Sequence, residues 1–207
     1  MAISARPAPK GTKPPKSRRR RMRIVGGRDK GRNLTAPPGR VARPTADRAR
    51  EALFNILAHS AHVELDEAVV VDAFAGSGAL GLEALSRGGA HATFLEMHPE
   101  SLAAIKANVT LLKQDGCTTI LRADATKPPL AKQPCTLALV DAPYNLELSA
   151  PCLAGLARQG WLAPGALAVV EVAAKEAFTP PAGFTIVDER TYGAARLVFV
   201  TFAQPEP

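Results

Sequence analysis

VDAFAGSGALGLEALSRG, residues 71–88, contains the signals that decide the fold of this chain. The β-branched run at residues 69–71 is typical of a buried strand, and the apolar residues at 80–85 recur at helical spacing. Between them, the glycines of the AGSG turn allow a tight change of direction and leave no Cβ atoms in the way of a ligand. The stretch therefore predicts a strand–turn–helix unit, whose helix N-terminus faces a crevice at the carboxyl end of the strand.

Each of the first four predicted strands is followed by an acidic side chain. Strand-like runs at residues 92–95, 118–121 and 137–140 follow the first strand, and the four acids are Asp72, Glu96, Asp124 and Asp141. Because the carboxyl ends of neighbouring parallel strands meet at one edge of a sheet, we expect these carboxylates to form the rim of one site. Glu96 follows the glycines by about 20 residues, a position from which an acid accepts hydrogen bonds from ribose hydroxyls.

Two groups of motifs resemble known methyltransferase families. Asp72 with AGSG, then Glu96, Asp124 and DAPY at residues 141–144, resemble the successive motifs of class I S-adenosylmethionine-dependent methyltransferases. DAPY is similar to the (D/N)PP(Y/F) signature of enzymes that methylate exocyclic or amide nitrogens. The segments RIVGGRDKGRNL, PPGRVARPTADRAREALFNIL and DAFAGSGALGLEALSRG resemble the RsmD family, the guanine-N2 methyltransferases of 16S ribosomal RNA. The likeness covers residues 22–202, with one departure at Ala142, where the family usually has a second proline.

The resemblance implies an α/β, Rossmann-like class I methyltransferase fold. Its sheet is expected to be seven-stranded and mostly parallel with one antiparallel strand, helices on both faces, and a small N-terminal β-hairpin and helix as an extension. We expect residues 1–21 to form a disordered basic tail, residues 22–60 an RNA-contacting extension and residues 61–207 the catalytic core. We also expect a cytoplasmic monomer without a metal.

The same resemblance implies a cofactor and a substrate. The cofactor is S-adenosylmethionine, which leaves as S-adenosylhomocysteine. The substrate is N2 of a specific guanine in 16S ribosomal RNA, of the guanine 966 type, within the small subunit or an assembly intermediate.

Individual residues receive roles from this likeness. The expected cofactor-binding residues are Asp72, Phe74, Gly76, Ser77, Gly78, Glu96, Asp124 and Ala125. The expected catalytic residues are Asp141, Ala142, Pro143 and Tyr144. The N2 amine of guanine is a poor nucleophile because its lone pair is conjugated with the ring. Acceptors at the Asp141 carboxylate and the Ala142 carbonyl could draw its two hydrogens toward a tetrahedral arrangement, while Tyr144 stacks on the base.

The distribution of charge supports a nucleic acid substrate independently. Residues 1–50 hold 16 Lys and Arg against two acids, a net charge of +14, whereas the remaining 157 residues have a net charge of −7. A basic arm joined to a mildly acidic core suits a polyanionic partner. The candidates for RNA contact are Arg18, Arg19, Arg20, Arg21, Arg43 and Arg50, of which Arg43 and Arg50 could instead cap the cofactor pocket.

The flanking segments predict the remaining elements. Residues 23–27 and 32–34 predict a small strand pair around a turn, and a helix at 46–58 should present Leu53, Phe54 and Leu57 to the sheet. After DAPY come a predicted helix at 147–159 and predicted strands at 166–171, 185–189 and 196–202, with Tyr192 and Gly193 in the last turn.

Other functions stay open at this level. DAPY also fits methylation of N6 of adenine in nucleic acid or, against the basic arm, of a glutamine amide in a protein. The G-x-G-x-x-G pattern at 76–81 fits a NAD-dependent oxidoreductase, which leaves DAPY unexplained. A non-catalytic RNA-binding assembly factor has only Ala142 in its favour. The scattered Cys117, Cys135 and Cys152 indicate a reducing compartment, and no apolar run reaches membrane-spanning length.

Overall fold

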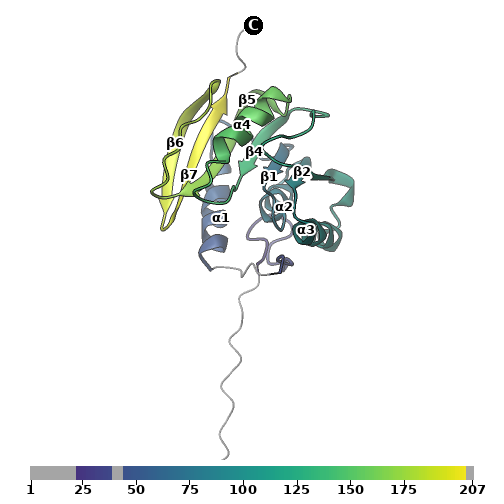
Figure 1. Ribbon diagram of the computed structural model, residues 1–207. Helices are drawn as coiled ribbons and strands as arrows, with labels where there is room; N and C mark the ends of the chain where they lie inside the picture. The colour runs from purple at the N-terminus through teal and green to yellow at the C-terminus, as the bar shows by residue number, and fades with distance from the viewer. Residues whose placement is uncertain (1–21, 39–43, 204–207) are drawn as a thin grey trace, which may run out of the picture.

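The computed structural model describes residues 22–38 and 44–203, which form a layered α/β structure (Figure 1). The strands are β1 (Val69–Ala73), β2 (His91–Glu96), β3 (Thr118–Arg122), β4 (Cys135–Val140), β5 (Leu162–Ala173), β6 (Phe184–Tyr192) and β7 (Ala195–Phe202). The helices are α1 (Pro44–Leu57), α2 (Ala79–Ser86), α3 (Pro99–Leu112), α4 (Ser149–Arg158) and a short 3₁₀ turn, η1 (Asp115–Cys117). Within these residues, no helix is both long and apolar enough to cross a membrane.

All seven strands form one sheet in the order β3-β2-β1-β4-β5-β7-β6. Strands β1 to β5 run parallel to one another, and β7 is antiparallel to both β5 and β6. The prediction of a mostly parallel seven-stranded sheet with one antiparallel strand is confirmed. Nearly continuous apolar strands, such as Val69–Ala73, are typical of parallel strands that are buried on both faces.

Helices cover both faces of this sheet. On one face, apolar side chains of α1, α2 and α3 pack with Val70 and Leu139, and on the other face α4 packs with Val71 and Val140. Successive residues of a strand point to opposite faces, so neighbours such as Val70 and Val71 belong to different halves of the core. The predicted packing of Leu53, Phe54 and Leu57 is confirmed, since all three are buried in the α1 side of the core.

The N-terminal extension differs from the predicted strand pair. Arg23 and Asn33 form an isolated antiparallel bridge in place of two strands. Beyond this bridge the backbone turns, because the N–H of Arg32 donates to the carbonyl of Asp29 and the N–H of Gly31 donates to the carbonyl of Ile24. The N–H of Val25 faces the core, where it donates to the carboxylate of Glu83 at 2.8 Å. The extension is therefore held by α2 more than by its own pairing.

Strand β5 is longer than the predicted 166–171. Pro164 and Gly165 are strong turn formers, yet they lie inside the strand, where the pairing with β4 shifts register between Cys135 and Leu137. Gly165 has φ of 79°, which a glycine tolerates in an irregular ladder. The irregularity extends β5 toward its amino end without changing the order of the strands.

Candidate active site

The turn between β1 and α2 has a backbone that few residues adopt. Phe74, Gly76 and Gly78 have positive φ values of 59°, 58° and 76°. Glycine accepts this region freely, whereas a residue such as Phe74 is strained there by roughly 1–3 kcal/mol. Gly81 lets α2 approach the sheet, because a Cβ atom at this position would lie 2.5 Å from the Phe94 ring. The N-terminus of α2 is thereby directed toward the edge of the sheet where a ligand can bind.

Asp72 is the buried acid at the end of β1. It is 1% exposed, and its Oδ2 accepts a 2.8 Å hydrogen bond from the N–H of Gly81. Its Oδ1 has no hydrogen-bond partner among the described residues. Burial raises the pKa of Asp72 well above its usual value; the Gly81 hydrogen bond lowers it, while the charges of Asp141 and Glu96 raise it further. The Oδ1 atom is thus an acceptor that a bound donor or cation can satisfy.

Glu96, at the end of β2, organises the backbone beside this turn. Its Oε2 accepts a 2.8 Å hydrogen bond from the N–H of Gly76, and its Oε1 accepts one from Met97 and one from His98, each at 2.8 Å. The side chain is buried, so these bonds fix the direction of the carboxylate. A carboxylate has about four lone-pair sites, which leaves room for a hydroxyl of a ligand beside the backbone donors.

Asp124 follows β3, at the far end of the same edge. The hydroxyl and the N–H of Thr126 donate to its Oδ1 at 2.7 and 2.9 Å. These bonds, the hydroxyl first, hold the pKa of Asp124 below its usual value, so the group is ionised at neutral pH. Ala125 beside it is buried in the core on the α4 face.

The DAPY segment leaves the sheet directly after β4. The N–H of Asp141 is 3.4 Å from the carbonyl oxygen of Ala73, which keeps this residue next to the end of β1. Ala142 is buried, whereas Asp141 and Pro143 are exposed and Tyr144 is 37% exposed. The hydroxyl of Tyr144 donates a hydrogen bond to Oε1 of Glu171 on β5. The aromatic ring is therefore anchored at its tip and accessible along its side.

A cavity of about 290 Å³ joins the turn to the DAPY segment. Six of the predicted site residues line it: Arg50, Asp72, Phe74, Ser77, Asp141 and Tyr144. The glycine turn and the catalytic motif are 63 or more positions apart in the sequence, and the β1–β4 pairing brings them together. This cavity therefore brings the end of the glycine turn next to the DAPY segment.

The other predicted cofactor residues occupy the same edge beyond this cavity. Glu96 and Asp124 belong to the ends of β2 and β3, so the four acids follow the strand order β3-β2-β1-β4 along the edge. Among the described residues, the cavity lining does not include Gly76, Gly78, Glu96, Asp124, Ala125, Ala142 or Pro143. A ligand that reached from Asp124 to Asp141 would span four strands.

Arg50 also lines the cavity, as a buried residue. Its Nε lies 3.8 Å from Oε2 of Glu83, and its guanidinium donates to the carbonyl of Arg23. Glu83 is fully buried and also pairs with Arg87 at 2.8 Å. Arg50 is thus part of the cavity wall, and both of its predicted roles, contact with RNA and capping of the cofactor pocket, stay predictions.

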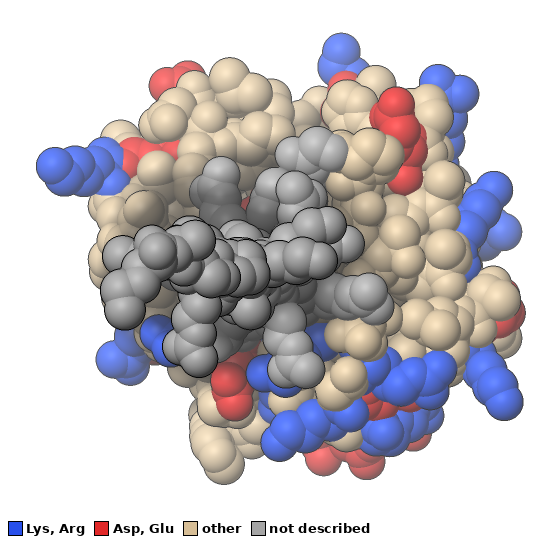
Figure 2. Space-filling view, turned by 90° about the horizontal axis from the view of Figure 1, so that it is seen from below, with Lys and Arg blue, Asp and Glu red and all other residues tan. Residues whose placement is uncertain are grey.

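The remaining candidates for RNA contact, Arg18, Arg19, Arg20, Arg21 and Arg43, lie outside the described residues. In the described part of the extension, five further basic side chains are exposed: Arg23, Arg28, Lys30, Arg32 and Arg48. Seen from below, the molecule has Lys and Arg side chains gathered along the lower border, with acids among them (Figure 2). A basic surface thus accompanies the acidic site.

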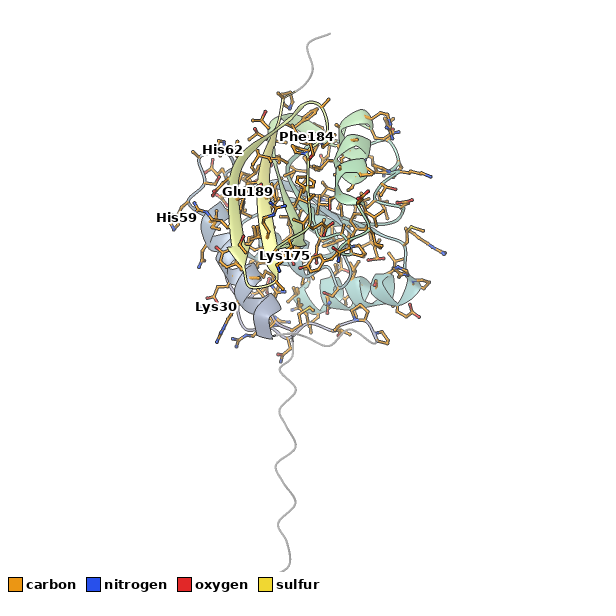
Figure 3. The ribbon with its side chains drawn as sticks, turned by 60° about the vertical axis from the view of Figure 1, so that its left-hand side comes forward. Lys30, His59, His62, Lys175, Phe184 and Glu189 are labelled. Atoms are coloured by element: carbon orange, nitrogen blue, oxygen red, sulfur yellow. The ribbon has the colours of Figure 1, made fainter. Side chains whose placement is uncertain are left out.

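A wider hollow of about 850 Å³ lies at the opposite edge of the sheet. It is lined by residues 57, 58 and 60–66, which lead toward the amino end of β1, together with Gly27 and Arg87. Figure 3 shows His59 and His62 on this outer side, next to the end of α1. Since none of the strand-end acids reaches it, the smaller cavity is the better candidate for catalysis.

Three polar or sulfur-containing side chains of the cavity, those of Glu171, Met22 and Tyr192, are not among the predicted site residues. The sequence predicts Tyr192 in the turn of the last hairpin, where it could lie near the base pocket or serve the hairpin alone. The sequence held a signal for Glu171, because the fifth predicted strand also finishes in an acid, as the first four do. Met22 gave no comparable signal; its sulfur accepts a hydrogen bond of 3.1 Å from the Ser77 hydroxyl.

Comparison with known proteins identifies the family. The family described as Conserved hypothetical protein 95 matches residues 22–201. Ribosomal RNA small subunit methyltransferase D from Escherichia coli is 38% identical over 183 residues, which cover 87% of this chain and 90% of the relative. The solved structure of the Escherichia coli protein yhhF superposes with a TM-score of 0.76 at 35% identity, over 89% of this chain and 99% of that one.

A solved RNA methyltransferase from Salinibacter ruber, in complex with S-adenosyl-L-homocysteine, shares the fold with a TM-score of 0.59 at 15% identity, over 81% of this chain and 97% of that one. The sheet order and the relatives agree with the class I methyltransferase fold predicted from the motifs. The chain belongs to the RsmD family, that of Conserved hypothetical protein 95, whose curated members include ribosomal RNA small subunit methyltransferase D.

Proposed function

We propose that this protein transfers a methyl group from S-adenosylmethionine to N2 of a guanine in small-subunit ribosomal RNA. The observation that carries the proposal is the shared cavity of Asp72, Phe74 and Ser77 with Asp141 and Tyr144. Relatives that span most of the chain are named ribosomal RNA small subunit methyltransferases, which supports ribosomal RNA as the substrate.

The residues at the edge of the sheet fit S-adenosylmethionine. The positive-φ glycines 76 and 78 leave no Cβ atoms at the turn, and the buried Oδ1 of Asp72 lacks a partner among the described residues. An amino or hydroxyl donor of the cofactor would satisfy this atom, which otherwise costs about 1–3 kcal/mol unpaired. Glu96 is placed for the ribose, and Asp124 with Ala125 for the adenine end. The cofactor, when bound, supplies an electrophilic methyl group on a sulfonium sulfur.

The DAPY segment activates the nitrogen. Asp141 accepts one hydrogen of the guanine N2 amine and the carbonyl of Ala142 accepts the other, which frees the nitrogen lone pair from the ring. Tyr144 stacks on the base and fixes its plane. The freed lone pair would accept the methyl group that the bound cofactor supplies, and Asp141 would take the proton that the nitrogen loses. Orientation of the two reactants contributes most of the rate enhancement.

The extension at 22–60 and the tail at 1–21 are proposed as the RNA-contacting part. The four exposed basic side chains between residues 23 and 32 support this division, because phosphate contacts depend on clustered Lys and Arg. We also propose that the protein is cytoplasmic and monomeric.

The proposal is tested by methyl transfer from labelled cofactor to 30S subunits from a strain that lacks this methylation, followed by nucleoside analysis. We expect label in N2-methylguanosine at one position. Label in N6-methyladenosine would make adenine the substrate in place of guanine, and binding of RNA without any transfer would favour an assembly factor.

A further inference from the structure

Glu171 occupies a defined place beside the catalytic motif. Val140 of β4 and Val170 of β5 form the last parallel pair of the two strands, so Asp141 and Glu171 follow side by side. Because side chains alternate along a strand, the side chains of Asp141 and Glu171 point to the opposite face of the sheet from Val140 and Val170. Both line the cavity, as does Leu197, the β7 partner of Glu171.

The hydrogen bond from Tyr144 places the Glu171 carboxylate at the tip of the aromatic ring. A base that stacks on this ring has its hydrogen-bonding edge close to the same carboxylate. One bond to the Tyr144 hydroxyl uses one of about four lone-pair sites, so the carboxylate keeps acceptor capacity toward the cavity.

Guanine presents three N–H groups on the edge that carries its N2 amine: two on N2 and one on N1. The acceptors here are also three, namely the carboxylate of Asp141, the carbonyl of Ala142 and the carboxylate of Glu171. We propose that Glu171 accepts the N1 hydrogen of the target base and thereby selects guanine. This inference rests on the proposed function and deepens it, since it names the residue that reads the base.

Adenine would present an acceptor, its N1 atom, to the carboxylate of Glu171. When its N6 amine is placed at Asp141 and Ala142, its N1 carries a lone pair in place of a hydrogen. That lone pair faces the carboxylate of Glu171, so the contact becomes repulsive and the hydrogen bond to N1 is lost. A site built to hydrogen-bond a substrate N–H discriminates strongly against an analogue that lacks it. Glu171 therefore supplies a repulsive element against adenine as well as an attraction for guanine.

The test replaces the target guanine with 2-aminopurine in synthetic RNA fragments, at the nucleotide that the nucleoside analysis identifies. 2-Aminopurine keeps the exocyclic amine that is methylated, but its N1 is an unprotonated acceptor. The wild-type protein should methylate guanine far faster than 2-aminopurine. Glu171→Gln can donate to N1, so it should methylate guanine more slowly, methylate 2-aminopurine faster than the wild type does, and lower the ratio of the two rates by at least about tenfold.

Tyr144→Phe is the matched control, because it removes the hydroxyl that contacts Glu171 and keeps the ring. Its guanine to 2-aminopurine ratio should stay near that of the wild type. If Glu171→Gln slows both substrates equally, Glu171 acts only by positioning Tyr144 and the inference is overturned, while the proposed function stands. If the wild-type protein fails to methylate guanine at all, the proposed function and this inference fail together.

Discussion

The N–H of Gly81 reaches back across the turn from α2 to Oδ2 of Asp72, at 2.8 Å, and fixes the carboxyl at the end of β1. The other oxygen of Asp72 is buried without a partner among the described residues. The chain thus maintains a half-satisfied carboxyl in its candidate cofactor site. Such a group costs stability in the absence of ligand, and its retention is consistent with a role in binding.

Asp72→Asn should separate the effect of Asp72 on stability from its effect on cofactor binding. Because burial raises the pKa of Asp72 in the folded protein, its contribution to stability is complete below the unfolded pKa and is lost as the pH rises through the folded pKa. The variant cannot ionise, so its free energy of unfolding should exceed that of the wild type by an amount that grows with pH and then levels off. Urea titrations without cofactor, between pH 5 and 9, measure this. A difference that is constant with pH would contradict the assignment.

Cofactor affinity should change in the opposite direction in the same variant. The amide that replaces the Asp72 carboxylate lacks the negative charge that favours a cationic ligand group, so S-adenosylmethionine should bind more weakly by about 1–3 kcal/mol. Calorimetry at one pH gives the value, and unchanged affinity would show that Asp72 has a structural role alone.

Glu96→Ala should weaken binding of S-adenosylmethionine by roughly 1–3 kcal/mol, through loss of charge-assisted hydrogen bonds. It also removes the acceptor for the N–H groups of Gly76, Met97 and His98, so the melting temperature should fall too. Glu64→Ala, an exposed acid at the opposite edge, is the control and should change neither quantity. Binding of NAD in place of S-adenosylmethionine would overturn the cofactor assignment.

The strands and the acids at their ends could be predicted because each signal is local. The glycines of the turn stand next to Asp72, and the acids at 96, 124 and 141 stand within two residues of their strands. To predict that these acids lie along one edge of the sheet, only one further rule was needed, namely that parallel strands align their carboxyl ends.

Two features depended on contacts between distant residues and could not be predicted: the burial of Glu83 and the contact of Glu171 with Tyr144. Glu83 lies in α2, whose residues are nearly all buried, and nothing in the local sequence shows that this acid is buried too. Its burial follows from Arg50 and the N–H of Val25, which lie 33 and 58 positions earlier. The position of Glu171 beside Tyr144 depends on the register of β5 with β4 and on where the DAPY segment directs Tyr144.

Deletion of residues 1–21 should weaken binding of ribosomal RNA and flatten its dependence on salt, because fewer phosphate contacts release fewer counterions. Affinity for S-adenosylmethionine should stay the same. Binding titrations at several salt concentrations measure the slope. If the slope is unchanged, the tail serves solubility and takes no part in binding.

Ala142→Pro tests the position at which the chain departs from its family. The backbone carbonyl of residue 142 is kept, and proline fits if φ is already near about −65°, so the rate of methyl transfer should remain within a few-fold of wild type. A folded variant without activity would mean that the backbone here departs from the family geometry, and the guanine-N2 assignment would weaken with it.

The most direct test of the account is the single-turnover rate of methyl transfer to RNA by Asp141→Ala, at saturating S-adenosylmethionine. Loss of the acceptor that orients the amine should lower this rate by at least about 100-fold, with cofactor affinity largely kept. Asp115→Ala removes an exposed acid in the η1 turn and should react at the wild-type rate. If Asp141→Ala reacts at a rate near that of the wild type, activation of the guanine amine by the DAPY segment is wrong.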